Sequence, residues 1–277
     1  MSKLIIFDTE TTGLEEEDRI IQVGALISDL YNKDLDTEIF NDLCKPTNDT
    51  PIKIEAMATH GIREEQIKNA LSFKKTDFYK KLNEYNNNEN YLIAHNLDFD
   101  LAMLEKEDFE NKLKLIDTLQ CAKHLFEIGE EINGYKLPNY KLQTFRYMMF
   151  SKNEEDEEAK KYSVEIKAHD AIGDVVILKM FLRELYKKVI QTYSIKNPIE
   201  IMDKMVELTK TPIPPEKVIV TFGKYAGKSV KEIYNADKGW LDWYKSTQNP
   251  QNDIVEAIKQ MEANKTNDTD INGALNF

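Results

Sequence analysis

The chain has 277 residues, of which 41% are hydrophobic, enough to bury one substantial core and to add a second, smaller unit. Its formal charge of −12 argues against a protein that coats long duplexes, because phosphate binding favours a basic surface. It argues less against a protein that grips a single strand end. Acidic runs at residues 15–18 and 154–158 are expected to be solvated loops.

The apolar run at the N-terminus ends at Asp8 and is too short for a signal peptide, and no later segment approaches membrane-spanning length. The two cysteines, Cys44 and Cys121, have no CxxC partner. Their isolation favours a reducing interior and two buried small side chains over disulfides or zinc. We therefore expect a cytoplasmic protein without membrane attachment.

Strands are expected at residues 4–7, 20–30 and 35–44, and the short connections between them indicate an antiparallel meander. A helix is predicted over 72–84. Short apolar runs at 91–94 and 114–116 each precede a helical segment, a pattern typical of parallel strands joined by helical crossovers.

The strongest helical pattern covers residues 170–188, and a shorter helix is expected over 199–208. A stiff proline linker follows at 211–215, and then a compact segment from 218 to about 261. The expected domains are residues 1–190 and 217–262, joined by a linker at 191–216 and followed by a disordered tail at 263–277.

Four carboxylates and a histidine are the strongest functional signal: Asp8, Glu10, Asp100, His169 and Asp174. Asp8 and Glu10 lie two apart in a strand and so share a face, whereas Asp100 and Asp174 begin helices. Four convergent acids cannot all stay ionised without cations, so the set predicts a divalent metal site. A histidine that titrates near neutral pH makes that site suited to phosphodiester hydrolysis.

Each of these residues taken singly has an equally good structural explanation. Asp-x-Glu pairs are common on surface strands, and acids at helix starts often serve as caps. For Asp170, which precedes the helix at 170–188, a capping role is the better interpretation. The combination, in this order and on these elements, favours catalysis.

Three motifs carry this set: FDTETTGL at 7–14, AHNLDFD at 94–100 and HDAIGD at 169–174. They resemble the motifs of DEDD-type 3′-to-5′ exonucleases, in the subgroup whose last motif contains histidine. The resemblance covers residues 3 to about 188, roughly two thirds of the chain. Gly173 stands where that family often has a bulkier residue, which is expected to loosen the helix slightly.

The resemblance implies an α/β, ribonuclease H-like fold with a five-stranded mixed sheet flanked by helices. It also implies two Mg²⁺ or Mn²⁺ ions, with Asp8 bridging both and Glu10, Asp100 and Asp174 completing their ligand sets. His169 would act as the general base on the attacking water. Such ions, about 4 Å apart, stabilise the attacking and leaving oxygens, and the product is a nucleoside monophosphate.

A nucleotide pocket is also implied by the resemblance. Thr9 and Thr12 would lie near the 3′-terminal sugar, Leu14 would wedge against a base, and His60 and Ile62 would line the other wall.

The second motif holds three further candidates. Phe99 would either stack on a base or pack in the core, and packing is favoured. His95 and Asn96 are interpreted either as phosphate contacts or as structural residues at the helix start.

The segment after the linker, with FGKYAGK at 222–228 and GWLDWY at 239–244, resembles the small domain of exodeoxyribonuclease X-like proteins. We expect it to form a small α+β domain. Lys224 and three neighbouring lysines concentrate positive charge there, and aromatic rings could stack on unpaired bases. The alternative is a small core of Trp240, Trp243 and Tyr244 with solvated lysines.

The chain ends NGALNF at 272–277, which resembles the QxxLxF-type peptide that bacterial replication proteins insert into the sliding clamp, with Asn272 in place of glutamine.

The sequence as a whole predicts a metal-dependent 3′-to-5′ exonuclease acting on DNA in repair or proofreading. One alternative keeps the chemistry and changes the substrate to RNA. Another is a replication or repair adaptor whose binding segments matter more than catalysis. The intact acidic set favours an enzyme, because an adaptor needs no convergent acids.

Overall fold

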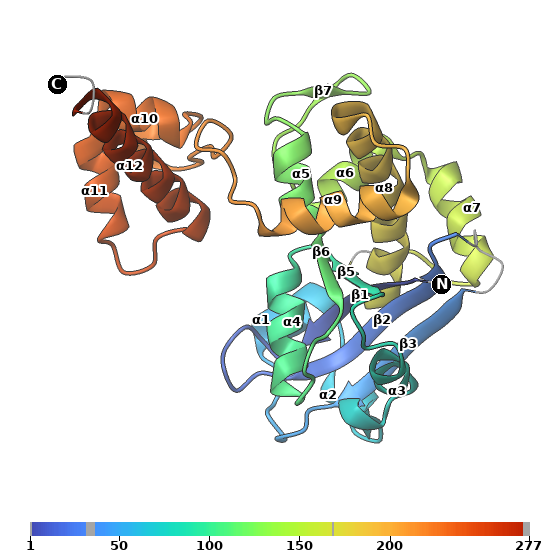
Figure 1. Ribbon diagram of the computed structural model, residues 1–277. Coiled ribbons are helices and arrows are strands. Elements are labelled where there is room, and N and C mark those ends of the chain that lie inside the picture. The colour runs from blue at the N-terminus through green and yellow to red at the C-terminus, as the bar shows by residue number, and fades with distance from the viewer. Residues whose placement is uncertain (1, 32–36, 168, 274–277) are drawn as a thin grey trace.

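The larger domain is built on a six-stranded sheet with the order β4-β3-β2-β1-β5-β6 in the computed structural model (Figure 1). The structure describes the backbone of residues 2–31, 37–167 and 169–273, and side chains as far as residue 263. The strands are β1 Lys3–Thr11, β2 Ile20–Asp29, β3 Glu38–Lys45, β4 Leu71–Ser72, β5 Tyr91–Ala94 and β6 Lys114–Asp117.

The predicted topology is confirmed. Strands β1, β2 and β3 form the antiparallel meander, and β5 and β6 continue the sheet in parallel from β1. The sixth strand, β4, pairs in parallel with β3 over two residues, too few to carry a periodic signal in the sequence. The mixed sheet flanked by helices is thus the expected α/β fold with one short strand added.

Helices cover both faces of this sheet (Figure 1). One face carries α5, α6, α8 and α9, whose apolar residues pack on Ile6, Leu26 and Ile93. The other carries α3 and α4, which pack on Ile5 and Phe7. The helices of this domain are α1 Ile54–His60, α2 Glu64–Ile67, α3 Asp77–Glu84, α4 Leu97–Lys106, α5 Thr118–Leu125, α6 Leu142–Met149, α7 Lys152–Tyr162, α8 Ala171–Tyr193 and α9 Pro198–Lys210, with a 3₁₀ turn at Phe73–Lys75 and a hairpin of β7 Glu131–Ile132 and β8 Tyr135–Lys136.

The acidic run at 154–158 is not a solvated loop. It lies in α7, where Glu155 and Glu158 are 3% and 4% exposed. Glu155 pairs with Arg146 of α6, and Glu158 pairs with Arg183 of α8, at N–O distances of 2.7 Å. The sequence predicted a solvated run because the arginines that neutralise these acids lie on other helices.

The segment at 191–216 is not an independent linker. Helix α8 extends to Tyr193, and α9 buries Ile201, Met202 and Met205 in the core of the larger domain. The backbone N–H of Asp117 also donates to Thr209 Oγ1 of α9, at 2.9 Å. The connection between the two domains therefore begins after α9.

The small domain contains α10 Val230–Ala236, α11 Lys238–Lys245, α12 Asn252–Gly273 and a 3₁₀ turn at Gly223–Tyr225. Its core includes Val220, Ile233, Leu241 and Ile258. The domain was expected to be α+β, but within the described residues its β-structure is a single antiparallel bridge between Ile219 and Ser229.

Helix α12 runs to Gly273, so the predicted disordered tail is helical over residues 264–273. Residues 274–277, which hold the apolar positions of the clamp-like peptide, lie outside the described residues. No helix in the described part of the chain is long and apolar enough to cross a membrane.

Helix α8 lies directly against β2 at Gly24. A Cβ added there would come within 2.4 Å of the backbone carbonyl carbon of Ala171 and the backbone nitrogen of Ile172. Gly173 plays a comparable part, since an added Cβ would lie 2.6 Å from the carbonyl oxygen of Lys167. The absence of a side chain at Gly173 therefore lets the segment before α8 pack against the helix. Helix propensity alone does not predict this role.

We predict that Gly24→Ala destabilises the protein by about 1–3 kcal/mol, because the sheet and α8 must separate to admit a methyl group. Urea unfolding of the purified variant measures this loss. Gly239→Ala is the matched control, since the added Cβ would lie 3.6 Å from its nearest neighbour, Asp237 Oδ1. Equal stability of Gly24→Ala and the unmodified protein would contradict the close packing described here.

Candidate active site

Three elements supply the acidic residues of the predicted site. Strand β1 presents Asp8 and Glu10 on the face that α8 covers, as the period of a strand requires. Helix α4 supplies Asp100 and the first turn of α8 supplies Asp174. The sheet thus brings together carboxylates that lie up to 166 positions apart in the sequence.

Asp100 is 3% exposed and is held by Thr9. Its Oδ1 accepts hydrogen bonds from the backbone N–H of Thr9 at 3.1 Å and from Thr9 Oγ1 at 2.7 Å. These bonds join the start of α4 to β1. The hydroxyl of Thr9 therefore orients a carboxylate of the site, in addition to lining the neighbouring cavity described below.

Asp174 is held from two directions. Its Oδ1 accepts from Gln143 Nε2 at 2.6 Å, and its Oδ2 accepts from the backbone N–H of His169 at 3.2 Å. Asp170 occupies the N-cap position of α8, as predicted, but its side chain makes no capping hydrogen bond. It accepts instead from Gln22 Nε2 of β2 at 2.9 Å.

The four carboxyl groups are electrostatically coupled. Burial raises the pKa of each: Glu10 to about 8, Asp100 to about 7, Asp174 to about 6, and Asp8 well above its usual range. The charges of Asp100 and Glu10 raise the pKa of Asp8 further, and those of Asp174 and Asp100 do the same for Glu10. Hydrogen bonds from Thr9 oppose the increase at Asp100. Each ionised acid thus makes the others harder to ionise.

This donor set suits a hard divalent cation, because all its donors are oxygens and burial makes their negative charges unfavourable in the folded chain alone. Among the residues whose placement is described, however, no three Asp, Glu, His or Cys side chains form a ready-made metal site. Asp100 and Asp174 are directed instead toward Thr9 and Gln143. The four carboxyl groups are close enough to influence one another's pKa values, but they are not arranged around a common point. Cation binding therefore stays a prediction.

His169 lies in the segment before α8, as expected. It is exposed and adopts a left-handed conformation with φ of 57°. Together with Asp8, Asp174 and Gln143 it lines an open cavity of about 670 Å³. The imidazole thus lies beside the acidic cluster and is open to solvent, and its role as a general base stays a prediction.

His95 and Asn96 differ in their surroundings. The Nε2 of His95 lies 2.9 Å from the carbonyl oxygen of Tyr140, and its Nδ1 lies 2.9 Å from Thr118 Oγ1. Burial lowers its pKa to about 4, so the ring is neutral. These contacts favour the structural interpretation of His95. Asn96 is exposed, has φ of 73° and lines the same cavity as His169, so a phosphate contact stays open for it.

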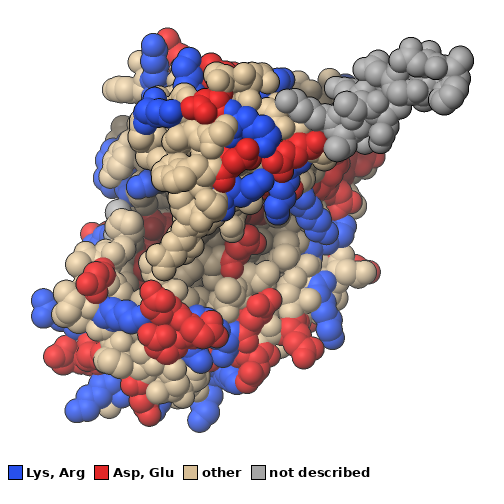
Figure 2. All heavy atoms as spheres, turned by 90° about the vertical axis from the view of Figure 1, so that its left-hand side faces the viewer, with Lys and Arg blue, Asp and Glu red and all other residues tan. Residues whose placement is uncertain are grey.

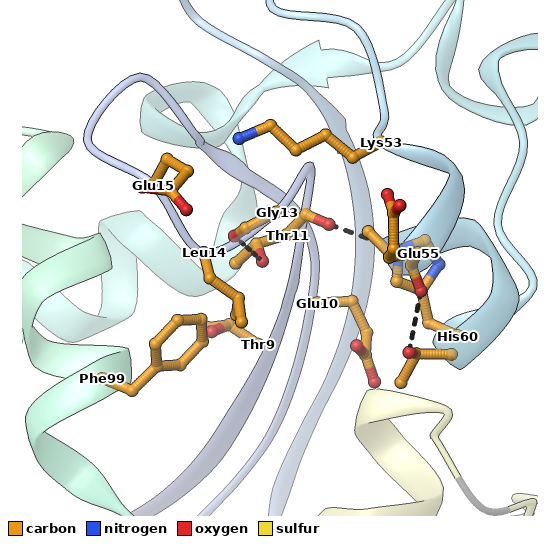
Figure 3. Close-up of a pocket in the computed structure, with 12 residues that line it drawn as sticks. Thr9, Glu10, Thr11, Gly13, Leu14, Glu15, Lys53, Glu55, His60 and Phe99 are labelled. Atoms are coloured by element: carbon orange, nitrogen blue, oxygen red, sulfur yellow. Dashed lines mark hydrogen bonds between the residues drawn. The ribbon is translucent and has the colours of Figure 1, made fainter. Parts of the chain in front are cut away.

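A second cavity, of about 380 Å³, is lined by Glu10 and by three residues of the predicted nucleotide pocket, Thr9, Leu14 and His60 (Figure 3). Nucleotide binding there stays a prediction. Leu14, which is 79% exposed, lies close to the ring of Phe99 at one side. His60 lies at the other side, with Nε2 3.3 Å from the carbonyl oxygen of Thr11. Phe99 both packs against the core and lines this cavity.

Two predicted pocket residues do not reach the cavity. Thr12 is fully buried, and its hydroxyl donates to Asp18 Oδ1 at 2.8 Å. Asp18 is also fully buried and pairs with Lys53 at 2.6 Å, so it is not part of a solvated loop. Ile62 is 6% exposed and packs with other isoleucines of a small cluster. Thr12 therefore stabilises the turn after β1, and Ile62 stabilises the segment that follows the helix carrying His60.

Lys224 belongs to the small domain and pairs with Asp237 at 2.9 Å. Residues 216–262 contain seven lysines and seven acidic residues, so the expected concentration of positive charge is offset. Figure 2 shows basic and acidic side chains intermingled over the face it presents. Trp240 stacks on Tyr244, with centroids 5.6 Å apart, which favours the small aromatic core, although Trp243 is 60% exposed. Substrate binding by Lys224 stays a prediction.

Sequence reasoning missed three residues around the site. Gln143 holds Asp174, Gln22 joins β2 to the start of α8, and Lys53 neutralises Asp18. Both glutamines lie in stretches that resemble the DEDD-type exonucleases, residues 18–25 and 140–144, but an uncharged side chain gave no indication of its role there. Lys53 offered a charge, but its partner lies 35 positions away.

Comparison with known proteins gives a family match and several relatives. A family model described as Exonuclease (RNase_T) matches residues 5–181. The DNA polymerase III subunit epsilon of Rickettsia prowazekii is 35% identical over 135 residues, which cover 44% of this chain and 55% of that protein. The same subunit from Buchnera aphidicola is 32% identical over 139 residues, 45% of this chain and 57% of that protein. The match thus spans little more than half the length of these subunits.

Two further comparisons cover more of the chain. Exodeoxyribonuclease 10 of Escherichia coli K12 is 27% identical over 247 residues, 87% of this chain and 89% of that protein. A zinc-bound form of an E. coli exonuclease I complex with single-stranded DNA has a TM-score of 0.50 and 18% identity, and the match covers 74% of this chain and 42% of that one. This second likeness concerns the fold.

The raised pKa values predict a pH-dependent stability in the absence of divalent cations. From about pH 4 upward the folded protein holds protons that the unfolded chain has released. Because of their raised pKa values, Asp174 keeps its proton to about pH 6, Asp100 to about pH 7 and Glu10 to about pH 8. Stability must therefore fall as pH rises through this window. In EDTA, Glu10→Gln should raise the melting temperature by about 2–4 °C at pH 8, and by much less at pH 5.

Glu16→Gln is the matched control, because Glu16 is exposed and lies outside the cluster. It should leave the melting temperature within about 1 °C at both pH values. A Glu10→Gln effect that is equal at pH 5 and pH 8 would contradict the electrostatic coupling. Addition of Mn²⁺ at pH 8 should raise the melting temperature of the unmodified protein.

Proposed function

Because the chain belongs to the exonuclease family, whose model matches residues 5–181, we propose that it is a metal-dependent 3′-to-5′ exonuclease acting on DNA. The observation that carries the proposal is the cluster of buried, mutually coupled carboxylates on β1, α4 and α8, adjoined by two cavities. Its relatives are named as an exodeoxyribonuclease and a DNA polymerase subunit, which supports DNA as the substrate and repair or proofreading as the setting.

Asp8, Glu10, Asp100 and Asp174 would hold two Mg²⁺ or Mn²⁺ ions, which supply charge stabilisation to the scissile phosphodiester when bound. His169, at the mouth of the cluster, takes the proton of the attacking water as general base. Leu14 and Phe99 hold the terminal base by apolar contact at one side of the smaller cavity. A nucleoside monophosphate is released and the strand is left with a new 3′-hydroxyl.

We predict that Asp8→Ala reduces hydrolysis by at least about 10³-fold, because metal-assisted stabilisation of several kcal/mol is lost. The measurement uses DNA and RNA oligonucleotides of one sequence, labelled at the 5′ end, incubated with Mg²⁺ or with EDTA and resolved on a gel. The unmodified protein should shorten the DNA from its 3′ end, and EDTA should abolish the reaction. His169→Ala should also abolish it.

Asp98→Ala is the matched control, because Asp98 is exposed on α4 two residues before Asp100. It should retain activity. Retained turnover by Asp8→Ala would overturn the mechanism. Degradation of RNA alone would keep the chemistry and change the substrate class. No degradation of either strand would favour an adaptor, whose partners would then include the sliding clamp suggested by the terminal peptide.

We further predict that Leu14→Ala raises the KM for single-stranded DNA about three- to tenfold while kcat changes little, because an exposed apolar wall of the nucleotide pocket is removed. Steady-state kinetics on a short oligonucleotide measure both constants. Since Leu14 is 79% exposed, stability should stay within about 0.5 kcal/mol of the unmodified protein. Leu71→Ala, at a 57% exposed leucine of β4, is the control, and an equal KM for both variants would contradict the assignment.

A further inference from the structure

Gln143 of α6 touches Asp174 directly and so stands next to the acidic cluster. Its Nε2 donates to Asp174 Oδ1 at 2.6 Å, and its side chain lines the same cavity as Asp8 and His169. The other oxygen of Asp174 accepts from the backbone N–H of His169. With both oxygens bonded, the rotation of this carboxylate is restricted.

Arg146, one turn further along α6, determines which end of the Gln143 amide faces Asp174. Its Nη1 donates to Gln143 Oε1 at 3.2 Å. A guanidinium has no acceptor, so the carbonyl of Gln143 must face Arg146 and the amide NH₂ must face Asp174. If the amide were reversed, its NH₂ group would face the N–H donors of Arg146, and its carbonyl oxygen would face the carboxylate of Asp174. Neither contact would be a hydrogen bond.

Arg146 is itself immobilised. It is 6% exposed, and its Nε and Nη2 donate to the two oxygens of Glu155 at 2.8 and 2.7 Å. Glu155 lies on α7, which begins with a capping box formed by Ser151 and Glu154. A chain of hydrogen bonds therefore runs from α7 through α6 to the acidic cluster, and each member fixes the orientation of the next.

We propose that Gln143 is a positioning residue that orients the Asp174 carboxylate for a divalent cation, and that the Arg146–Glu155 pair holds Gln143 in the required orientation. The inference rests on the proposed function, because it takes Asp174 as a ligand. Partners that hydrogen-bond to a ligating carboxylate typically change metal affinity 10- to 100-fold when they are removed. Helix α7, which has no residue in the cluster, thereby influences the site.

The first experiment titrates Mn²⁺ into the full-length protein without nucleic acid and follows the heat of binding. Gln143→Leu removes the hydrogen bond, and Gln143→Asn keeps the amide but is too short to reach both partners. Both variants should bind Mn²⁺ about 10- to 100-fold more weakly. Thr144→Val is the control on the same helix, because Thr144 Oγ1 donates to Asn139 Oδ1 and not to the cluster. It should bind Mn²⁺ within about twofold of the unmodified protein.

The second experiment tests the role of the ion pair. Arg146→Met and Glu155→Leu are introduced together, since loss of one partner would leave a buried charge. The pair variant should weaken Mn²⁺ binding, and adding Gln143→Leu should cause little further loss, because the pair acts through Gln143. Melting curves recorded without metal report any general destabilisation, which would not produce this non-additivity.

The outcomes separate this inference from the proposed function. If the unmodified protein binds Mn²⁺ and degrades DNA, but Gln143→Leu binds Mn²⁺ equally well, the positioning role is wrong and the proposed function stands. Additive losses would overturn the coupling through Arg146. A raised KM for DNA with unchanged Mn²⁺ affinity would assign Gln143 to substrate contact and overturn the inference. Failure of the unmodified protein to bind Mn²⁺ overturns both.

Discussion

The burial of four carboxyl groups around β1 is the constraint on which the rest of this structure depends. Ionisation of any one of them is opposed by loss of solvent and by its neighbours, so the folded chain alone does not stabilise the fully charged cluster. Packing of β1, α4 and α8 must hold these groups together against their repulsion. The contact of α8 with Gly24 and the hydrogen bonds from Thr9 and Gln143 provide that support. Cation binding, which stays a prediction, would relieve this repulsion.

Much of the fold followed from sequence patterns that act over short distances. Alternation in β2 and the long apolar pattern of α8 reflect how each element meets the core, so their positions were predictable. The shared face of Asp8 and Glu10 follows from strand geometry alone. By contrast, β4 is two residues long, and its existence depends on where β3 happens to lie. Such an element has no local signal.

The candidate site shows the same division. The family resemblance named its acids and its pocket residues, but it did not distinguish an exposed wall such as Leu14 from a buried support such as Thr12. That difference arises because the hydroxyl of Thr12 has a partner in Asp18, across a turn. Likewise, Glu155 looked like a solvated acid because Arg146, which neutralises it, lies on another helix. Contacts between different helices and strands decide which side chains are buried. The local sequence around a residue does not show these contacts.

The distribution of charge bears on the proposed function, in which an acidic protein acts on a polyanion. Lysines and acids balance within residues 216–262, so the net charge of −12 resides in the rest of the chain. There the four carboxylates of the cluster contribute to the excess negative charge, and bound divalent ions would neutralise them. Glu155, Glu158 and Asp18 are balanced by Arg146, Arg183 and Lys53, so these three pairs add nothing to the net charge. Under the proposed function, metal binding would therefore remove part of the excess negative charge, and it would do so at the site itself. The repulsion that remains acts over the wider surface, which disfavours long duplex contacts while leaving a local, metal-centred contact possible.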